Sequence, residues 1–86
     1  MVTALVFVDV KPSEVTRVGS SIADIEGVRE VYSVAGNEDL VAILWVRNHE
    51  DIATIVTEQI AALKGVEATR TLIAFRSYST ADRTLI

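Results

Sequence analysis

The feature that most constrains this chain is that two short segments are apolar on both of their faces. From Leu40 to Val46 every residue is apolar, and seven residues is the length of a strand. From Val2 to Val10, alternate positions carry valine or alanine, while Leu5 and Phe7 lie among the positions between them. Large apolar side chains on both faces are typical of strands in a sheet that is covered on both sides.

The chain is too small to hide this much apolar surface alone. It has 86 residues, half of them hydrophobic, which corresponds to one domain. A domain of this size buries only roughly 60–65% of its unfolded surface. We therefore expect a second copy of the chain to cover the apolar surface that remains, in a homo-oligomer.

The rest of the chain predicts two helices. Apolar residues recur at spacings of three and four after Pro12 and again after Asn48, which indicates two amphipathic helices. We expect Ser13 to cap the first helix, and Asn48 or His49 to begin the second. The apolar stripes consist of Val15, Val18, Ile22 and Ile25 in the first helix and of Ile52, Ile55, Val56, Ile60 and Leu63 in the second.

A glycine and a strand follow each predicted helix. Gly27 and Gly65 suit left-handed helix ends. The strands are predicted over Val28 to Ala35 and Val66 to Phe75, which are rich in residues that favour strands. With the two doubly apolar segments, these elements give the order β-α-β-β-α-β.

This order predicts a fold of the α+β class. Residues 22–28 resemble residues 60–66 at an offset of 38, so the chain consists of two similar halves. Two right-handed β-α-β units give a ferredoxin-like fold, a four-stranded antiparallel sheet with both helices on one face. The other face is predicted to pair with the same face of a second copy, forming a dimer. We place this domain at residues 1–78 and a C-terminal tail at 79–86.

Composition excludes several kinds of function. The chain has no cysteine, so disulfides and thiolate metal sites are excluded, and its single histidine, His49, is expected to be solvated. The sequence holds no Gly-rich phosphate loop, and we predict no catalytic residues, no metal and no cofactor. A net charge of −4 argues against direct binding of nucleic acid. No membrane span or signal peptide is visible, so we expect a cytoplasmic protein.

Two polar features are candidates for a binding site. Residues 36–39 predict a turn between the second and third strands in which Gly36 and Asn37 tolerate positive φ. Its backbone N–H groups suit a carboxylate, and Asp39 suits an ammonium group, so the turn could hold a small zwitterion. Thr69 and Thr71 are two residues apart on the last strand, so their hydroxyls point to one face. A plain hairpin turn and ordinary strand-forming threonines remain the simpler interpretation of both features.

Four short motifs together resemble the effector-binding domain of the Lrp/AsnC, or feast/famine, transcriptional regulators, over about residues 2–78. The motifs are Gly27-Val28, Val34-x-Gly36-x-x-Asp39-Leu40, Leu63-x-Gly65-Val66 and Thr69-x-Thr71-Leu72-Ile73.

The resemblance implies more than the residues themselves show. Members of this family form sheet-to-sheet dimers, often assembled into rings of four dimers, and bind effectors, usually amino acids, between dimers. By the family's pattern, the effector contacts would come from Gly36, Asn37, Asp39, Thr69 and Thr71. Full-length members carry an N-terminal helix-turn-helix that binds DNA. This chain begins at the first strand, so we expect a stand-alone effector domain that could join a full-length regulator.

One position departs from the family's pattern. Glu38 stands where the family often has an aromatic residue, which leaves the choice of effector open.

Three other functions fit the same elements. Small dimeric ferredoxin-like enzymes, such as cofactor-independent monooxygenases, need polar groups between sheet and helices, whereas the stripes here are apolar. ACT-like domains also sense amino acids but usually pair edge to edge. A purely structural assembly module would have an empty site.

Overall fold

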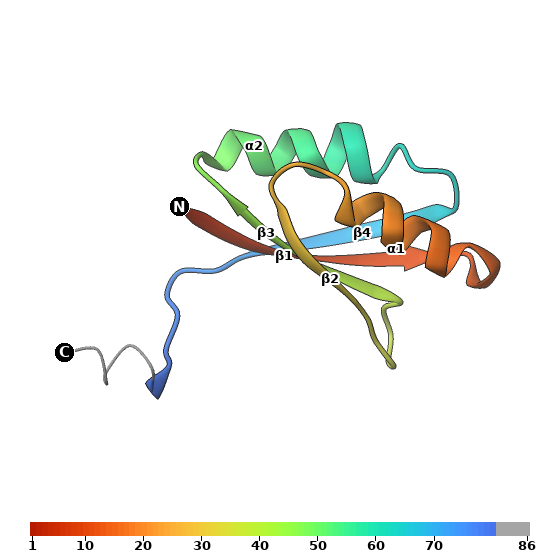
Figure 1. Ribbon diagram of the computed structural model, residues 1–86, viewed down its shortest axis with the longest axis horizontal. Coiled ribbons are helices and arrows are strands. Elements are labelled where there is room, and N and C mark those ends of the chain that lie inside the picture. The colour runs from red at the N-terminus through yellow and green to blue at the C-terminus, as the bar shows by residue number, and fades with distance from the viewer. Residues whose placement is uncertain (81–86) are drawn as a thin grey trace.

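The two doubly apolar segments form the centre of a four-stranded antiparallel sheet (Figure 1). They are β1 (Val2–Val10) and β3 (Leu40–Val46) in the computed structural model, which describes residues 1–80. The edge strands are β2 (Val28–Ser33) and β4 (Val66–Ile73), and the order across the sheet is β2-β3-β1-β4. The predicted ferredoxin-like arrangement is confirmed, and the strands with two apolar faces are the two that have neighbours on both sides.

Both helices cover one face of this sheet (Figure 1). Helix α1 (Val15–Ala23) follows the short 3-10 turn η1 (Pro12–Glu14). Helix α2 (His49–Thr54) continues as η2 (Ile55–Ile60), which has π-helical hydrogen bonding. The predicted stripe residues pack against the core, but Ile25 and Leu63 do so from the turns after α1 and η2, because those helices end at Ala23 and Ile60. The buried core consists of Ala4, Val6, Val8, Val10, Val18, Ile22, Leu40, Ala42, Leu44, Val46, Ile52, Ile55 and Ile60.

The start of the first helix differs from the prediction. Ser13 does not cap α1, because it lies inside η1, where the backbone N–H of Glu14 donates to the carbonyl of Lys11 at 2.8 Å. No side chain caps α1, which begins at Val15. The proline fixes its own φ and so favours this tight turn ahead of the helix.

The start of the second helix agrees with the prediction. Asn48 is its N-terminal cap residue, and the carboxylate of Asp51 accepts a hydrogen bond from the Asn48 backbone N–H at 3.2 Å. Asp51 and Glu50 both lie in the first turn, where negative charge suits the helix dipole.

Two strands end earlier than predicted. Strand β2 ends at Ser33, because the backbone N–H of Val34 bonds to the carbonyl of Asp39 within the turn to β3. Strand β4 ends at Ile73, which lies opposite Ala4 near the start of β1. The chain from Ala74 to Ser79 has no regular secondary structure, and residues 81–86 of the predicted tail lie outside the described residues. No helix within residues 1–80 is long and apolar enough to cross a membrane.

Gly27 connects the helical layer to the sheet at a point where no side chain fits. Its φ is +97°, in the left-handed region, as predicted for a glycine after the first helix. A Cβ atom there would lie 2.8 Å from Cδ1 of Ile55 and 3.0 Å from Cγ1 of Val46. The glycine is therefore needed both for its backbone conformation and for the close approach of α1, β3 and η2.

We predict opposite effects of alanine at two glycines. Gly27→Ala should lower the free energy of unfolding by about 2–4 kcal/mol, because backbone strain adds to the clash with Ile55. Gly19→Ala, inside α1, should raise it by about 0.5–1 kcal/mol, because its Cβ would meet Leu40 at an ordinary 3.5 Å. Urea denaturation of both variants tests this pair, and equal changes would contradict the assigned role of Gly27.

Candidate functional site

The predicted turn is present and exposed at one end of the sheet. It joins β2 to β3 and is closed by a hydrogen bond of 3.1 Å from the backbone N–H of Val34 to the carbonyl of Asp39. Gly36 has a φ of +147°, and no other atom lies within 4 Å of the place where its Cβ would be. Gly36 and Asn37 are both exposed. The backbone at the tip of this turn is therefore open to a small molecule.

Asp39 ties this turn to the central strand. Its carboxylate Oδ2 accepts a hydrogen bond from the backbone N–H of Val10 at 2.8 Å, and its own N–H donates to the carbonyl of Val8 at 3.2 Å. The sequence did not predict this structural role, because it depends on a strand 29 residues away. The second carboxylate oxygen of Asp39 is not used in this link.

Thr69 and Thr71 lie on the helix-covered side of the sheet. They pair with Val8 and Val6, which are fully buried under the helices, and both threonines are half-buried. The prediction that the two hydroxyls share one face is confirmed. However, β1 separates β4 from β3, so Thr69 is about 10 Å, or two strand spacings, from Leu40 at the β3 end of the turn, and Thr71 is further away.

An ion pair joins β4 to the turn across the opposite side of the sheet. Nη2 of Arg70 lies 2.6 Å from Oε1 of Glu38, and the Arg70 guanidinium lies 4.4 Å from the centre of the Phe7 ring. Phe7 alternates with buried Val6 and Val8, so this contact is on the face away from the helices. Sequence reasoning treated Glu38 only as a departure from a pattern and missed this pair.

The face away from the helices is largely apolar and uncovered. Across the sheet, Leu5 lies between Ile43 and Leu72. Nearly half of the surface of Trp45 is exposed (46%), and Tyr32 is 50% exposed, so neither residue packs in the core of this chain. We call this surface the open face, and its apolar residues are Leu5, Phe7, Tyr32, Val41, Ile43, Trp45 and Leu72.

Charged groups surround the open face. The Arg29 guanidinium lies 5.2 Å from the centre of the Trp45 ring. The Tyr32 hydroxyl donates to Oε2 of Glu30 at 2.5 Å, and this bond to the carboxylate raises the pKa of the Tyr32 hydroxyl. An apolar centre with a polar rim is the usual composition of a protein interface.

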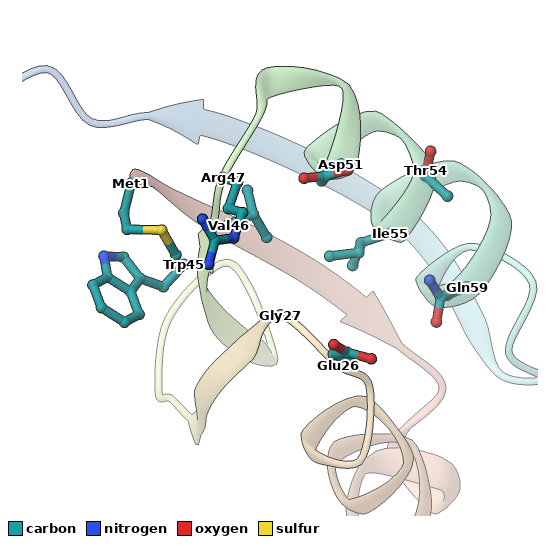
Figure 2. Close-up of a pocket in the computed structure, with 10 residues that line it drawn as sticks. All are labelled: Met1, Glu26, Gly27, Trp45, Val46, Arg47, Asp51, Thr54, Ile55 and Gln59. Carbon is teal, nitrogen blue, oxygen red and sulfur yellow. The ribbon is translucent and has the colours of Figure 1, made fainter.

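A hollow of about 480 Å³ lies at the other end of the sheet, between α2 with η2 and the loop before β2 (Figure 2). Met1, Trp45 and Ile55 supply apolar walls, and Glu26 and Asp51 supply carboxylates. Sequence reasoning did not find this hollow, because its residues come from four separate segments. Among residues 1–80, no group of histidine, aspartate and glutamate side chains is placed to hold a metal ion.

Comparison with known proteins gives consistent results. The profile of the Lrp/AsnC ligand binding domain family matches residues 3–84. The transcriptional regulator LrpA of Pyrococcus horikoshii is 34% identical over 59 residues, which are 69% of this chain and 42% of LrpA. This chain thus matches less than half the length of the first curated relatives.

Solved structures show the same fold. The protein TTHA0845 from Thermus thermophilus is 43% identical, with a TM-score of 0.87 over 92% of this chain and 99% of that protein. A feast or famine regulatory protein from M. tuberculosis, complexed with L-methionine, is 25% identical, with a TM-score of 0.77 over 92% of this chain and 53% of that protein.

The hydrogen bond from the Val10 N–H to the Asp39 carboxylate predicts that two substitutions of Asp39 change stability to different extents. Asp39→Ala should lower the free energy of unfolding by about 1–3 kcal/mol, because the Val10 N–H loses its acceptor. Asp39→Asn keeps an acceptor oxygen and should cost less than about 1 kcal/mol. Chemical denaturation measures both, and equal stability of the alanine variant and the wild type would show that the bond contributes nothing.

Proposed function

Because this chain belongs to the Lrp/AsnC ligand-binding domain family, we propose that it binds an amino-acid effector and that binding is coupled to the association of several copies. The main observation behind this proposal is the exposed turn at residues 36–39, which has a glycine with positive φ and a hydrogen bond from Val10 of β1 to Asp39. A binding loop needs exposed backbone N–H groups and a firm attachment to the rest of the fold. Gly36 and Asn37 are exposed, and the hydrogen bond from Val10 to Asp39 attaches the turn to β1. The related M. tuberculosis protein that was crystallised with L-methionine supports the class of ligand.

The turn offers partners for both charged groups of an amino acid. Backbone N–H groups near Gly36 and Asn37 would donate to the carboxylate. The Asp39 oxygen that does not bind Val10 would accept from the ammonium group. Thr69 and Thr71 would supply hydroxyls. Because β1 separates these threonines from the turn within one chain, association of copies is the simplest way to bring both halves to one ligand.

The open face supports pairing of two copies. An uncovered apolar centre on the two central strands is unfavourable in water, and a two-fold dimer would bury this surface against the same apolar surface and charged rim of a second copy. We propose a sheet-to-sheet dimer as the basic unit, with further assembly into rings of four dimers.

The core argues for a binding module over an enzyme. Within residues 1–80, no polar or charged residue is fully buried between the sheet and the helices. The ferredoxin-like enzymes considered above need polar groups in that space. LrpA of Pyrococcus horikoshii is a transcriptional regulator, so we propose that this chain acts in transcription regulation, through a full-length regulator as partner.

The effector proposal predicts a loss of affinity in a single variant. Asp39→Asn removes the charge that would face the ammonium group and should weaken amino-acid binding by roughly ten- to a hundredfold. Isothermal titration calorimetry with a panel of amino acids, including methionine, measures this. Asp24→Asn makes the same chemical change in the exposed loop after α1 and should leave affinity unchanged.

Two outcomes would contradict the assignment. Equal affinities of the wild type and Asp39→Asn would remove Asp39 from the site. No binding by the wild type across the panel would favour a purely structural assembly module.

The pairing proposal predicts a dimer at micromolar concentration. Ile43→Glu puts a charge at the centre of the open face and should shift the protein to a folded monomer in analytical ultracentrifugation. Ala53→Glu adds the same charge on the exposed side of α2 and should leave the dimer intact. A wild type that sediments as a compact monomer would refute the proposal.

A further inference from the structure

A carboxylate at one end of the open face has a buried oxygen that no group of its own chain satisfies. Asp9 alternates along β1 with buried Val8 and Val10, so its side chain lies on the side away from the helices. Among the non-exposed side chains of residues 1–80, Oδ1 of Asp9 is the only buried nitrogen or oxygen without a hydrogen-bond partner. Buried polar groups in folded proteins are almost always hydrogen-bonded, because leaving one unpaired is unfavourable. Asp9 therefore lacks a donor that a covering surface would supply.

A guanidinium without a carboxylate partner lies toward the opposite end of the same face. Arg29 lies where the register of β2 shifts between Val28 and Glu30, and its guanidinium lies 5.2 Å from the centre of the Trp45 ring. The neighbouring Glu30 carboxylate accepts from the Tyr32 hydroxyl instead. Within the described part of the chain, Arg29 takes part in no ion pair. Its N–H groups are thus held over an aromatic ring and are free to bind a carboxylate.

The positions of these two charges favour one direction of stacking between two copies. Trp45 pairs with Thr3 of β1, and Asp9 is six residues further along that strand, or about 20 Å away. If like ends of two open faces met, the two Asp9 carboxylates would come together, which the repulsion of like charges disfavours. If opposite ends meet, each Asp9 comes to the end of the other sheet where Arg29 lies.

Stacking with opposite ends together also buries the apolar centre. A two-fold axis that crosses the strands halfway between the levels of Asp9 and Trp45 passes between Leu5 and Phe7. Asp9 and Trp45 lie on neighbouring strands, so they are offset by about 5 Å across the sheet and about 20 Å along it. A crossing angle of about 30° between the two sheets compensates for this offset, and that is the usual angle between stacked sheets.

We propose that the two sheets of the dimer stack with opposite ends together, so that Asp9 of each copy binds the partner's Arg29 beside the Trp45 ring. This inference rests on the sheet-to-sheet dimer proposed above. The two-fold axis makes the contact twice, so each dimer has two such pairs. This stacking also places the two turns at residues 36–39 at opposite ends of the dimer, where each is accessible for the further assembly proposed above.

A charge swap tests the pairing. Asp9→Lys and Arg29→Glu, made in separate chains, should each raise the dimer dissociation constant roughly tenfold or more in analytical ultracentrifugation, because each puts like charges together at both contacts. The two changes in one chain rebuild the pair with its charges exchanged and should restore most of the lost affinity. Glu58→Lys makes the same change of charge as Asp9→Lys on the exposed side of η2 and should leave the dissociation constant unchanged.

A smaller change keeps the test valid if lysine at position 9 disturbs the strand. Asp9→Ala removes only the carboxylate, so the folded monomer loses no hydrogen bond, whereas the dimer loses two ion pairs. We expect its dissociation constant to rise about threefold or more. A dissociation constant equal to that of the wild type, or a charge-swapped chain that associates no better than the single variants, would overturn the pairing.

Cross-linking reports the direction of stacking without altering the pair itself. Thr3 lies opposite Trp45 and Ala68 lies opposite Asp9, so both are on the open face, one toward each end. In the proposed stacking, Ala68 faces the partner's Thr3. The natural chain has no cysteine, so Thr3→Cys and Ala68→Cys are made in separate chains, one with a tag of distinguishable size. A short bis-maleimide reagent should cross-link the mixture into a heterodimer, whereas Thr3→Cys alone should give little covalent dimer.

The remaining outcomes separate this inference from the dimer itself. A covalent dimer from Thr3→Cys alone, in a yield equal to that of the mixture, would show that like ends meet and would overturn the stacking while the sheet-to-sheet dimer stands. Dimers in sedimentation that cross-link in neither sample would have the same meaning. A wild type that sediments as a monomer would refute the dimer, and the stacking with it.

Discussion

The structure depends on the burial of β1 and β3, the two strands that are apolar on both sides. One side is covered by α1 and by α2 with η2, whose apolar stripes form a core with no buried polar residue among those described. The other side, the open face, has apolar side chains at its centre and charged groups at its rim. Because exposed apolar surface is unfavourable in water, we propose that a second copy covers this face.

The candidate ligand site and the open face share structural elements. Asp39 connects the turn to the end of β1, and Glu38 from the same turn holds Arg70 over Phe7, which is part of the open face. A ligand that changes the position of this turn therefore acts on groups that border the proposed dimer interface. By thermodynamic linkage, an effector that binds one state of assembly more tightly also stabilises that state. In our proposal, the ion pair between Glu38 and Arg70 links ligand binding at the turn to association through the open face.

Much of the fold could be predicted from the sequence because its signals are local. The helix stripes, the glycines that follow them and the seven-residue apolar run each depend on a few neighbouring positions. The last residue of each predicted stripe, Ile25 and Leu63, lies beyond the end of its helix, and the other stripe residues lie in the helices as predicted. The errors occurred at the ends of elements. Ser13 is a good capping residue, but the proline before it favours a 3-10 turn. Strand β2 stops at Ser33, opposite the first residue of β3, so that limit is set by another part of the chain. Strand β4 stops at Ile73, opposite Ala4, although β1 begins at Val2.

The sequence by itself determined the order of the elements, the positive φ at Gly36, and the common face of Thr69 and Thr71, because periodicity and the freedom of glycine act over a few residues. Only the tertiary structure decided which groups meet. The hydrogen bond from Val10 to Asp39, the pair of Arg70 with Glu38, and the hollow that contains Trp45 each join residues far apart in sequence. The hydrogen bond and the ion pair form because the antiparallel register brings the turn beside the end of β1 and near β4, and register is a property of the folded sheet rather than of any one segment. The hollow forms where α2 and η2 pass over the loop before β2.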